Sequence, residues 1–141
     1  MRKILVGVDG SEASVKAVRM AGELAAKNDA RLVLFHAIFP NLLSPAVYPE
    51  LVKQLEKEER AASDRLVAEV VEKAGVKALS PEVRMVTGAA PETIADVAAT
   101  DDDVWMVVVG SHGRNAALRV LLGSTPDRLI HICQKPVLVV R

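Results

Sequence analysis

The chain has 141 residues, which suit a single domain with a substantial core. Half of the residues are hydrophobic but only 3% are aromatic, so the core must be aliphatic. The 18 basic and 18 acidic residues balance, which argues against a nucleic-acid-binding surface, and the single cysteine excludes an internal disulfide framework. No apolar run approaches the roughly 18 residues of a membrane-spanning helix. The first residues lack a signal-peptide cleavage pattern, so we expect a cytoplasmic protein with no membrane insertion.

Strand-like and helical patterns alternate along the chain. Short apolar runs predict buried strands at residues 3–8, 31–38, within 78–86, 104–109 and 136–140. Helical periodicity predicts helices from a Ser11 cap to about residue 28, and over residues 50–74, 91–99 and 126–133. This order predicts an α/β fold of one domain over residues 1–141, a doubly wound five-stranded parallel sheet with helices on both faces.

Prolines mark two departures from this regular pattern. Pro40, Pro45 and Pro49 indicate a loop over residues 39–49, the longest break between elements. Pro81 interrupts the third strand early, which predicts an edge position, because proline cannot donate to a central ladder.

Residues 107–125, VVVGSHGRNAALRVLLGST, carry the strongest functional signal. A buried strand stops at Gly110, a turn of small residues runs to Gly113, and Gly123-Ser124-Thr125 precedes a further helical pattern. A glycine loop and a helix start present backbone N–H groups to an anion, which predicts phosphate binding. The alternative is a pair of ordinary surface turns.

The order of the strands bears on this choice. In doubly wound sheets, ligands bind beyond the carboxyl ends of the strands, where the strand order reverses. If the first and fourth strands flank that point, Asp9 faces the glycine loop across one crevice. That convergence favours the phosphate hypothesis.

At these residues the chain resembles the universal stress protein family. Gly110 and Gly113, then nine residues, then Gly123-Ser124 match the pattern G-x2-G-x9-G-[S/T] of the family's ATP-binding branch. The resemblance extends over the whole chain, through KILVGVDGSEAS, LFHA, VVVGSHGR and KPVLVVR. It implies a Rossmann-like sheet, similar to the adenine nucleotide alpha hydrolase fold, with strand order 3-2-1-4-5.

The resemblance also implies a role for each matching position in an ATP site. Backbone groups of Ala37 would bind the adenine edge, and the turn at Thr87-Gly88 would wall the site. The other expected ATP contacts are the Val8 backbone and Asp9 at the nucleoside, Val109 and Gly110 beside the ribose, and Gly113, Arg114, Gly123, Ser124 and Thr125 around the phosphates. We expect Asp9 to contact Mg²⁺ bound with the ATP, its alternative role being a turn that caps the first helix.

Other candidate chemistry is weaker. The chain has neither a Walker A loop nor a G-x-G-x-x-G pattern, which disfavours a dinucleotide enzyme. His112 is interpreted as a loop residue rather than an acid-base group, and His36 as structural or as a pocket wall. His131 and Cys133 lie on different helix faces, which is poor metal geometry, and Cys133 is expected to be buried. The run 101–103 of three aspartates is interpreted as a solvated loop rather than a metal site.

No set of nucleophile, base and orienting residue is visible, so no catalytic residue is assigned. We predict an ATP-binding, nucleotide-dependent stress-response or regulatory module. The alternatives are a slow ATPase or nucleotide-dependent phosphotransfer protein, and an interaction module with a vestigial pocket. The last strand, from Pro136 to Val140, is apolar and ends the sequence of strands, and the resemblance implies that it pairs antiparallel in a homodimer.

Overall fold

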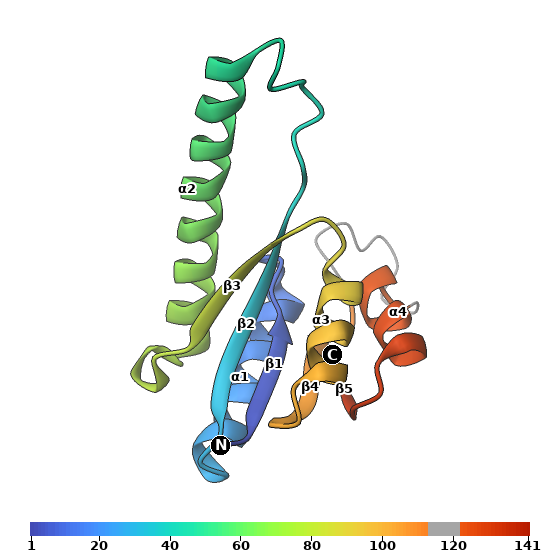
Figure 1. Ribbon diagram of the computed structural model, residues 1–141. Helices are drawn as coiled ribbons and strands as arrows, with labels where there is room; N and C mark the ends of the chain where they lie inside the picture. The colour runs from blue at the N-terminus through green and yellow to red at the C-terminus, as the bar shows by residue number, and fades with distance from the viewer. Residues whose placement is uncertain (113–121) are drawn as a thin grey trace.

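The computed structural model describes residues 1–112 and 122–141. Its strands form one five-stranded parallel sheet in the order β3-β2-β1-β4-β5, with helices on both faces (Figure 1). The strands are β1 (Lys3–Gly7), β2 (Arg31–Ile38), β3 (Glu82–Thr87), β4 (Val104–Gly110) and β5 (Val137–Val140). The helices are α1 (Glu12–Lys27), α2 (Pro49–Ala74), α3 (Ala90–Thr100) and α4 (Ser124–Ile132), with a 3-10 turn η1 at Lys77–Leu79. The predicted fold class and strand order are confirmed.

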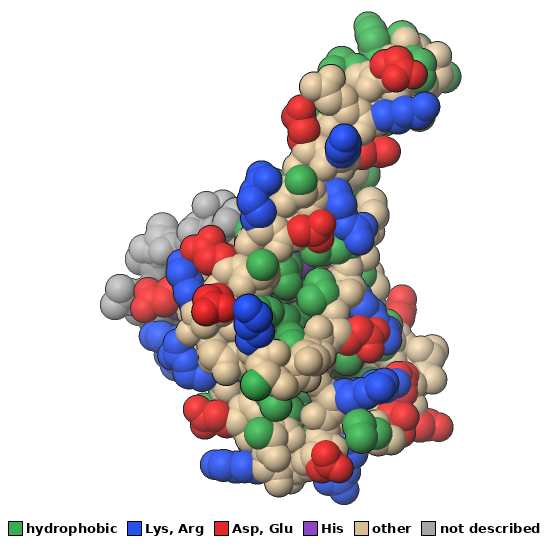
Figure 2. Space-filling view, turned by 90° about the vertical axis from the view of Figure 1, so that its left-hand side faces the viewer, with side chains coloured by type: hydrophobic (Ala, Val, Ile, Leu, Met, Phe, Trp, Pro, Cys, Tyr) green, Lys and Arg blue, Asp and Glu red, His purple; other side chains and the backbone are tan. Residues whose placement is uncertain are grey.

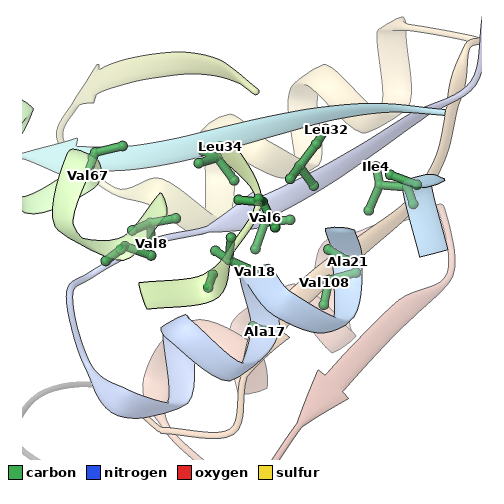
Figure 3. Close-up of a cluster of buried hydrophobic side chains, with 14 residues drawn as sticks. Ile4, Val6, Val8, Ala17, Val18, Ala21, Leu32, Leu34, Val67 and Val108 are labelled. Carbon is green, nitrogen blue, oxygen red and sulfur yellow. The ribbon is translucent and has the colours of Figure 1, made fainter. Parts of the chain in front are cut away.

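Alternate side chains of the central strands feed two cores, one on each face of the sheet. Ile4 and Val6 of β1 point into the core under α1 and α2, whereas Leu5 points into the core under α3 and α4. This alternation follows from the twofold repeat of a strand. It explains why the strand sequences read as unbroken apolar runs: both faces are covered, so neither can be polar. Figure 3 shows the first of these cores.

Small residues bring α1 close to the sheet and to its neighbour. Ala17, Ala21 and Ala25 are buried on the sheet-facing side of α1. On another side of the helix, Gly22 packs against Val76, whose Cγ1 would clash with a Cβ at position 22. The helix starts at a side-chain cap, because the Ser11 hydroxyl accepts a hydrogen bond from the Ser14 amide at 3.1 Å. The Ser11 cap is thus confirmed.

The element boundaries differ from the sequence-based expectations in two informative places. Residues 77–79 form η1 rather than strand, so β3 begins only after Pro81, at the edge position that this proline predicted. Helix α4 begins at Ser124, two residues before the expected start at Pro126. Pro126 therefore occupies the third helical position, within the first turn, where a missing N–H costs no helical hydrogen bond.

Helix α2 extends far beyond the sheet. Together with the loop 39–48, its first turns project from the body (Figures 1 and 2). We call residues 39–60 the arm. In the described residues, none of the helices is both long and apolar enough to cross a lipid bilayer.

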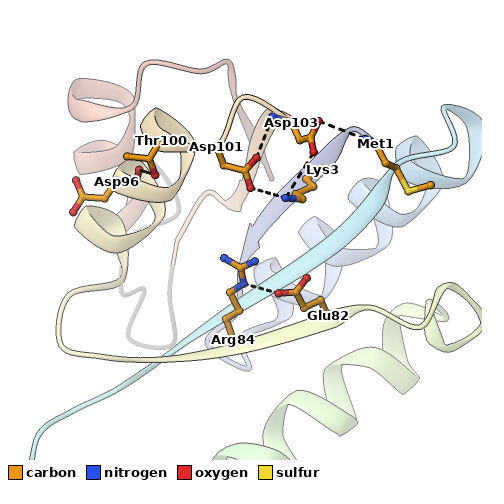
Figure 4. Close-up of polar contacts among 8 residues, drawn as sticks. All are labelled: Met1, Lys3, Glu82, Arg84, Asp96, Thr100, Asp101 and Asp103. Carbon is orange, nitrogen blue, oxygen red and sulfur yellow. Dashed lines mark hydrogen bonds and ion pairs between the residues drawn. The ribbon is translucent and has the colours of Figure 1, made fainter.

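At the end of the sheet opposite the arm, ion pairs link the amino ends of β1 and β4 (Figure 4). The Lys3 ammonium donates to Asp101 Oδ2 at 2.6 Å, and the amino group of Met1 lies 3.4 Å from Asp103 Oδ1. Two of the three consecutive aspartates thus serve to hold strand ends together. The hydrogen bond from Lys3 lowers the pKa of the Asp101 carboxyl below its ordinary value.

We expect Lys3→Met to raise the pKa of Asp101 toward its ordinary value, because the donor that favours the carboxylate is removed. In the wild type, the lowered pKa contributes stability that is fully present above the unfolded-state pKa and is lost as the pH falls through the folded-state value. The stability difference between wild type and variant should therefore shrink in acid. Carboxyl NMR titration and urea unfolding at several pH values measure both effects. Lys16→Met, at an exposed lysine of α1, is the control, and an unchanged Asp101 pKa in Lys3→Met would contradict the assignment.

Candidate functional site

The strand order reverses at β1, which lies between β2 and β4. Val6 of β1 is in register with Val108 of β4, so the turn after β1 lies beside the turn after β4. The sequence pattern predicts Asp9 and the glycine loop on either side of this point. The structure confirms that the two turns meet at one edge of the sheet, although part of the glycine loop lies outside the described residues.

The turn after β1 is held by Asp9. Its Oδ1 accepts a hydrogen bond from the Ser11 amide at 2.9 Å, while Gly10 between them adopts a φ of +79° that favours glycine. Asp9 therefore does form the turn that leads into α1. In the part of the chain that the structure describes, its Oδ2 has no hydrogen-bond partner, so one oxygen remains to accept from a ligand or contact a cation.

Val8 is tied to β2 by both of its backbone groups. Its amide donates to the Phe35 carbonyl at 2.8 Å, and its carbonyl lies 2.8 Å from Nδ1 of His36. Because a carbonyl can only accept, His36 Nδ1 carries the proton, which leaves Nε2 as an acceptor in the neutral ring. His36 is thus a structural residue that holds the end of β1 in place. The sequence suggested a structural role but held no signal for this particular bond.

Ala37 presents the most informative backbone of the site. In a parallel strand, both backbone groups of a residue point toward the same side, and the side alternates from one residue to the next. The Phe35 carbonyl faces β1, where it accepts from Val8, and the Ile38 carbonyl faces β3, where it accepts from Gly88 at 2.9 Å. The amide and carbonyl of Ala37 therefore face the β1 side. Since β1 has already ended at Gly7, neither group has a partner among residues 1–112 and 122–141.

Gly88 shapes the neighbouring wall. It has a φ of +96°, which favours glycine, and its amide closes the β3–α3 turn onto Ile38. The turn at Thr87-Gly88 thus lies beside the end of β2, where Thr87 is in register with Ile38, the residue after Ala37.

Gly110 is required by packing. A Cβ at this position would lie 2.8 Å from the backbone carbon of Ala13 in α1 and 2.9 Å from its Cβ. The first turn of α1 therefore rests directly on the end of β4, and the preceding residue, Val109, is buried. From the glycine motif alone, we expect Gly110 to be needed because a ligand approaches its backbone. The structure shows a separate, sufficient reason for it.

The two described ends of the glycine loop are joined by a hydrogen bond between Gly123 and Ser111. The Ser111 amide donates to the Val140 carbonyl at 2.8 Å, and its carbonyl accepts from the Gly123 amide at 2.7 Å. Its buried hydroxyl lies 2.9 Å from Nδ1 of His112, which gives this histidine a structural partner. Gly113 and Arg114, the first expected phosphate contacts, lie outside the described residues, as does most of the apolar segment before Gly123.

Helix α4 starts directly after this junction, with Gly123 as its N-cap and no side-chain cap. The amides of Ser124 and Thr125 have no acceptor within the described residues, and Pro126 has no amide hydrogen. The start of α4 thus combines two free N–H donors with the positive end of a helix dipole, an arrangement suited to an anion. Arg128 anchors the helix to α3 through a 2.9 Å hydrogen bond to Glu92, which lowers the pKa of that carboxyl.

The remaining candidate residues stay apart from this edge of the sheet. His131 Nδ1 bonds the Asp127 carbonyl within α4, and Cys133 is partly buried against the core rather than fully buried as expected. Among the described residues, no three His, Cys, Asp or Glu side chains gather in a way that could hold a metal ion.

Comparison with known proteins identifies the family. The model of the universal stress protein family matches residues 1–141. The chain belongs to this family. A universal stress protein of Mycolicibacterium smegmatis is 36% identical over 143 residues, which cover 97% of this chain and 47% of that relative. The chain therefore spans about half the length of this relative.

Solved universal stress proteins share the fold. UspA from Lactobacillus plantarum superimposes with a TM-score of 0.78 at 28% identity, covering 99% of this chain and 97% of that structure. A universal stress protein crystallised in complex with cAMP has a TM-score of 0.66 and 29% identity, covering 99% of this chain and 96% of that structure.

We expect Gly110→Ala to destabilise the fold by about 1–3 kcal/mol, because the added methyl group meets the backbone of α1, which cannot move away cheaply. Urea unfolding measures the change. Gly7→Ala is the matched control in a neighbouring strand, since its added Cβ would meet only side chains, at 3.6 and 3.7 Å. Equal destabilisation by the two variants would show that the Ala13 contact is not what requires Gly110.

Proposed function

We propose that this universal stress protein binds an adenine nucleotide at the carboxyl edge of its sheet, with ATP as the ligand. The observation that carries the proposal is the backbone of Ala37, whose amide and carbonyl have no partner within the described part of the chain because β2 continues past the end of β1. The amide donor and carbonyl acceptor of this single residue match the N1 acceptor and the neighbouring N6 amino donor on the edge of adenine. The small side chain of Ala37, which is only partly buried, leaves room for a ring beside the strand.

The phosphates are proposed to lie at the start of α4. The amides of Ser124 and Thr125 are free within the described chain, and the helix dipole favours negative charge there. Gly113 and Arg114 complete this end of the site in the sequence motif of the ATP-binding branch. The free Oδ2 of Asp9 lies in the turn between the two halves and suits a contact to the ribose or to a Mg²⁺ ion carried by the phosphates.

A related structure supports the choice of an adenine nucleotide. The universal stress protein in complex with cAMP is 29% identical to this chain and covers nearly all of it. Cyclic AMP and ATP share the adenosine group that Ala37 is proposed to bind. They differ at the phosphates. The G-x2-G-x9-G-[S/T] spacing of this chain is that of the ATP-binding branch and therefore favours the triphosphate of ATP over the single cyclic phosphate of cAMP.

Ser124→Pro tests the phosphate contact with little cost to the fold. Ser124 is the first helical residue, a position that favours proline, and Gly123 before it has φ −63° and ψ 164°, a conformation compatible with a following proline. The variant should keep the melting temperature of the free protein but lose one N–H donor to phosphate. Because a hydrogen bond to a charged group contributes about 1.5–3 kcal/mol, ATP affinity should fall at least about tenfold.

Thermal shift with ATP, ADP, AMP, cAMP and GTP, with and without Mg²⁺, measures the binding, since a ligand specific for the folded state raises its stability. Ser124→Ala, which keeps the amide, is the matched control. The loss should be larger for ATP than for AMP if the amide binds the outer phosphates. No shift with any adenine nucleotide at millimolar concentration would contradict the proposed function.

We also propose that β5 pairs antiparallel with β5 of a second copy. The Pro136 carbonyl accepts from the Val107 amide of β4 at 2.9 Å, and the Val140 carbonyl accepts from the Ser111 amide, just after β4, at 2.8 Å. By alternation, the backbone groups of Val137 and Val139 therefore point outward from the sheet. An apolar strand with free outward groups is a ready template for pairing.

Amide hydrogen exchange distinguishes a paired edge from a free one. In a homodimer, the Val139 amide should exchange slowly at high protein concentration and faster on dilution, because dissociation exposes it to water. The Leu138 amide, which faces β4, is the internal control and should stay slow throughout. Fast exchange of Val139 at every concentration would contradict the pairing.

A further inference from the structure

The arm, from its root at Phe39 to the start of α2, exposes an unusual amount of hydrophobic surface. Leu42 is 97% exposed, Phe39 76% and Val47 63%, and Tyr48 and Leu51 are about half exposed. Figure 2 shows hydrophobic side chains at the tip of the projecting arm. Contiguous exposed apolar groups of this kind mark interaction surfaces in folded proteins.

A second uncovered apolar surface lies at the other end of the same helix. Between α2 and the edge strand β3 is a groove of about 460 Å³. None of the β3 residues is fully buried, and Val83 is 42% exposed. We call this hollow the α2–β3 groove; its lining is Asp64, Val67, Ala68, Val71, Glu72, Lys77, Ser80, Pro81, Val83 and Met85.

The face of α2 that borders this groove carries charge of opposite sign at its two ends. Lys53, Lys57 and Arg60 line a hollow at the root of the arm, whereas Asp64 and Glu72 line the α2–β3 groove. The spacing from residue 53 through 57, 60, 64, 68 and 71 keeps these positions on one side of the helix. The arm half of this face is therefore cationic and the groove half anionic.

Countercharges are present but do not cancel this pattern. Glu56 and Glu59 share the hollow at the arm root, and Lys77 stands across the groove from α2. Within the chain, Lys53 lies 3.9 Å from Glu50 and Arg60 lies 3.7 Å from Asp64. These side chains are more than 60% exposed, and such surface pairs contribute little. The charges on this face therefore remain able to pair with another molecule.

We propose that this face of α2 docks antiparallel onto the same face of a second copy of the chain, around a twofold axis near Ala61. A twofold contact requires a self-complementary surface, in which each half matches the other. The cationic half then meets the partner's anionic half, with Lys57 opposite the partner's Asp64, and each contact occurs twice. Exposed Ala61 and Ala68 on this face let the two helices approach closely.

The same arrangement covers both apolar surfaces. If position 57 lies opposite position 64, the first residue of α2, Pro49, lies opposite Glu72, which lines the partner's groove. The distance from Ala61 to either point is about 17–18 Å at 1.5 Å per residue. Leu42 and Val47, in the loop before Pro49, then reach the partner's Val71 and Val83. Two unpartnered surfaces on one chain thus become one interface between two chains.

Cysteine cross-linking near the axis tests the geometry directly and requires no nucleotide. In a Cys133→Ser background, Ala61→Cys should form a disulfide-linked dimer in high yield under mild oxidation at about micromolar protein. The exposed Ala99 of α3 provides the control, Ala99→Cys, which should cross-link only at the level of random collisions. This readout does not depend on pairing of β5. A yield for Ala61→Cys no higher than that of the control would overturn the proposal.

Charge reversal tests the register. In the Ala61→Cys background, Lys57→Asp and Asp64→Lys each place like charges opposite one another, and each should lower the cross-linking yield severalfold. The double variant restores opposite charges across the axis and should return the yield to within about twofold of the starting value, although it does not restore the contact between Arg60 and Asp64. Failure of the double variant to recover would overturn the proposed pairing.

The arm end provides the last test. Leu42→Asp should lower the cross-linking yield severalfold, whereas Met20→Asp, at a 41% exposed position of α1, should leave it unchanged. The competing occupant is a lipid surface, tested by sedimentation with vesicles of phosphatidylcholine and phosphatidylglycerol. An unchanged cross-linking yield in Leu42→Asp, with loss of vesicle binding, would assign the arm end to membranes and overturn the proposal.

Discussion

The site depends on a mismatch in strand length at the centre of the sheet. Strand β1 ends at Gly7, while its neighbour β2 continues through Ile38 and β4 through Gly110. Backbone groups that a longer β1 would have satisfied are left at Ala37 without a partner among residues 1–112 and 122–141. Because an unpaired backbone group is costly to keep away from water, this notch must be filled by solvent or by a ligand with complementary hydrogen bonds.

The residues around the notch mainly make it rigid. His36 holds the carbonyl of Val8, Asp9 holds the amide of Ser11, and Gly110 allows α1 to rest on the end of β4. These contacts hold the ends of β1 and β4 and the start of α1 in place before any ligand arrives. A preorganised backbone lowers the entropic cost of binding. Such an arrangement suits holding a nucleotide.

Helix α2 extends past the body for a similar geometric reason. At 26 residues it is about 39 Å long, whereas β2, the longest strand, has eight residues and spans about 26 Å. The first turns of a helix that exceeds its sheet by this margin lie beyond the two cores of the sheet, and over residues 49–60 only Val52 is buried. We propose that a second copy of the chain docks at the surfaces at the two ends of α2 and at the outward backbone groups of β5, which have no partner among the described residues.

The sequence by itself predicted the strands and helices, the double winding and the edge position of β3, whereas the meeting of the Asp9 turn with the start of the glycine loop depended on a strand order that only the family resemblance implied. The features predicted by the sequence itself follow from apolar periodicity, proline chemistry and right-handed crossovers, which act over short stretches or apply to every parallel sheet. Only the tertiary structure decided which backbone groups stay free, that Gly110 is needed for Ala13, that Lys3 bonds Asp101, and that α2 leaves a groove beside β3. Each of these depends on contacts between residues distant in the chain, and a local pattern carries no record of such contacts.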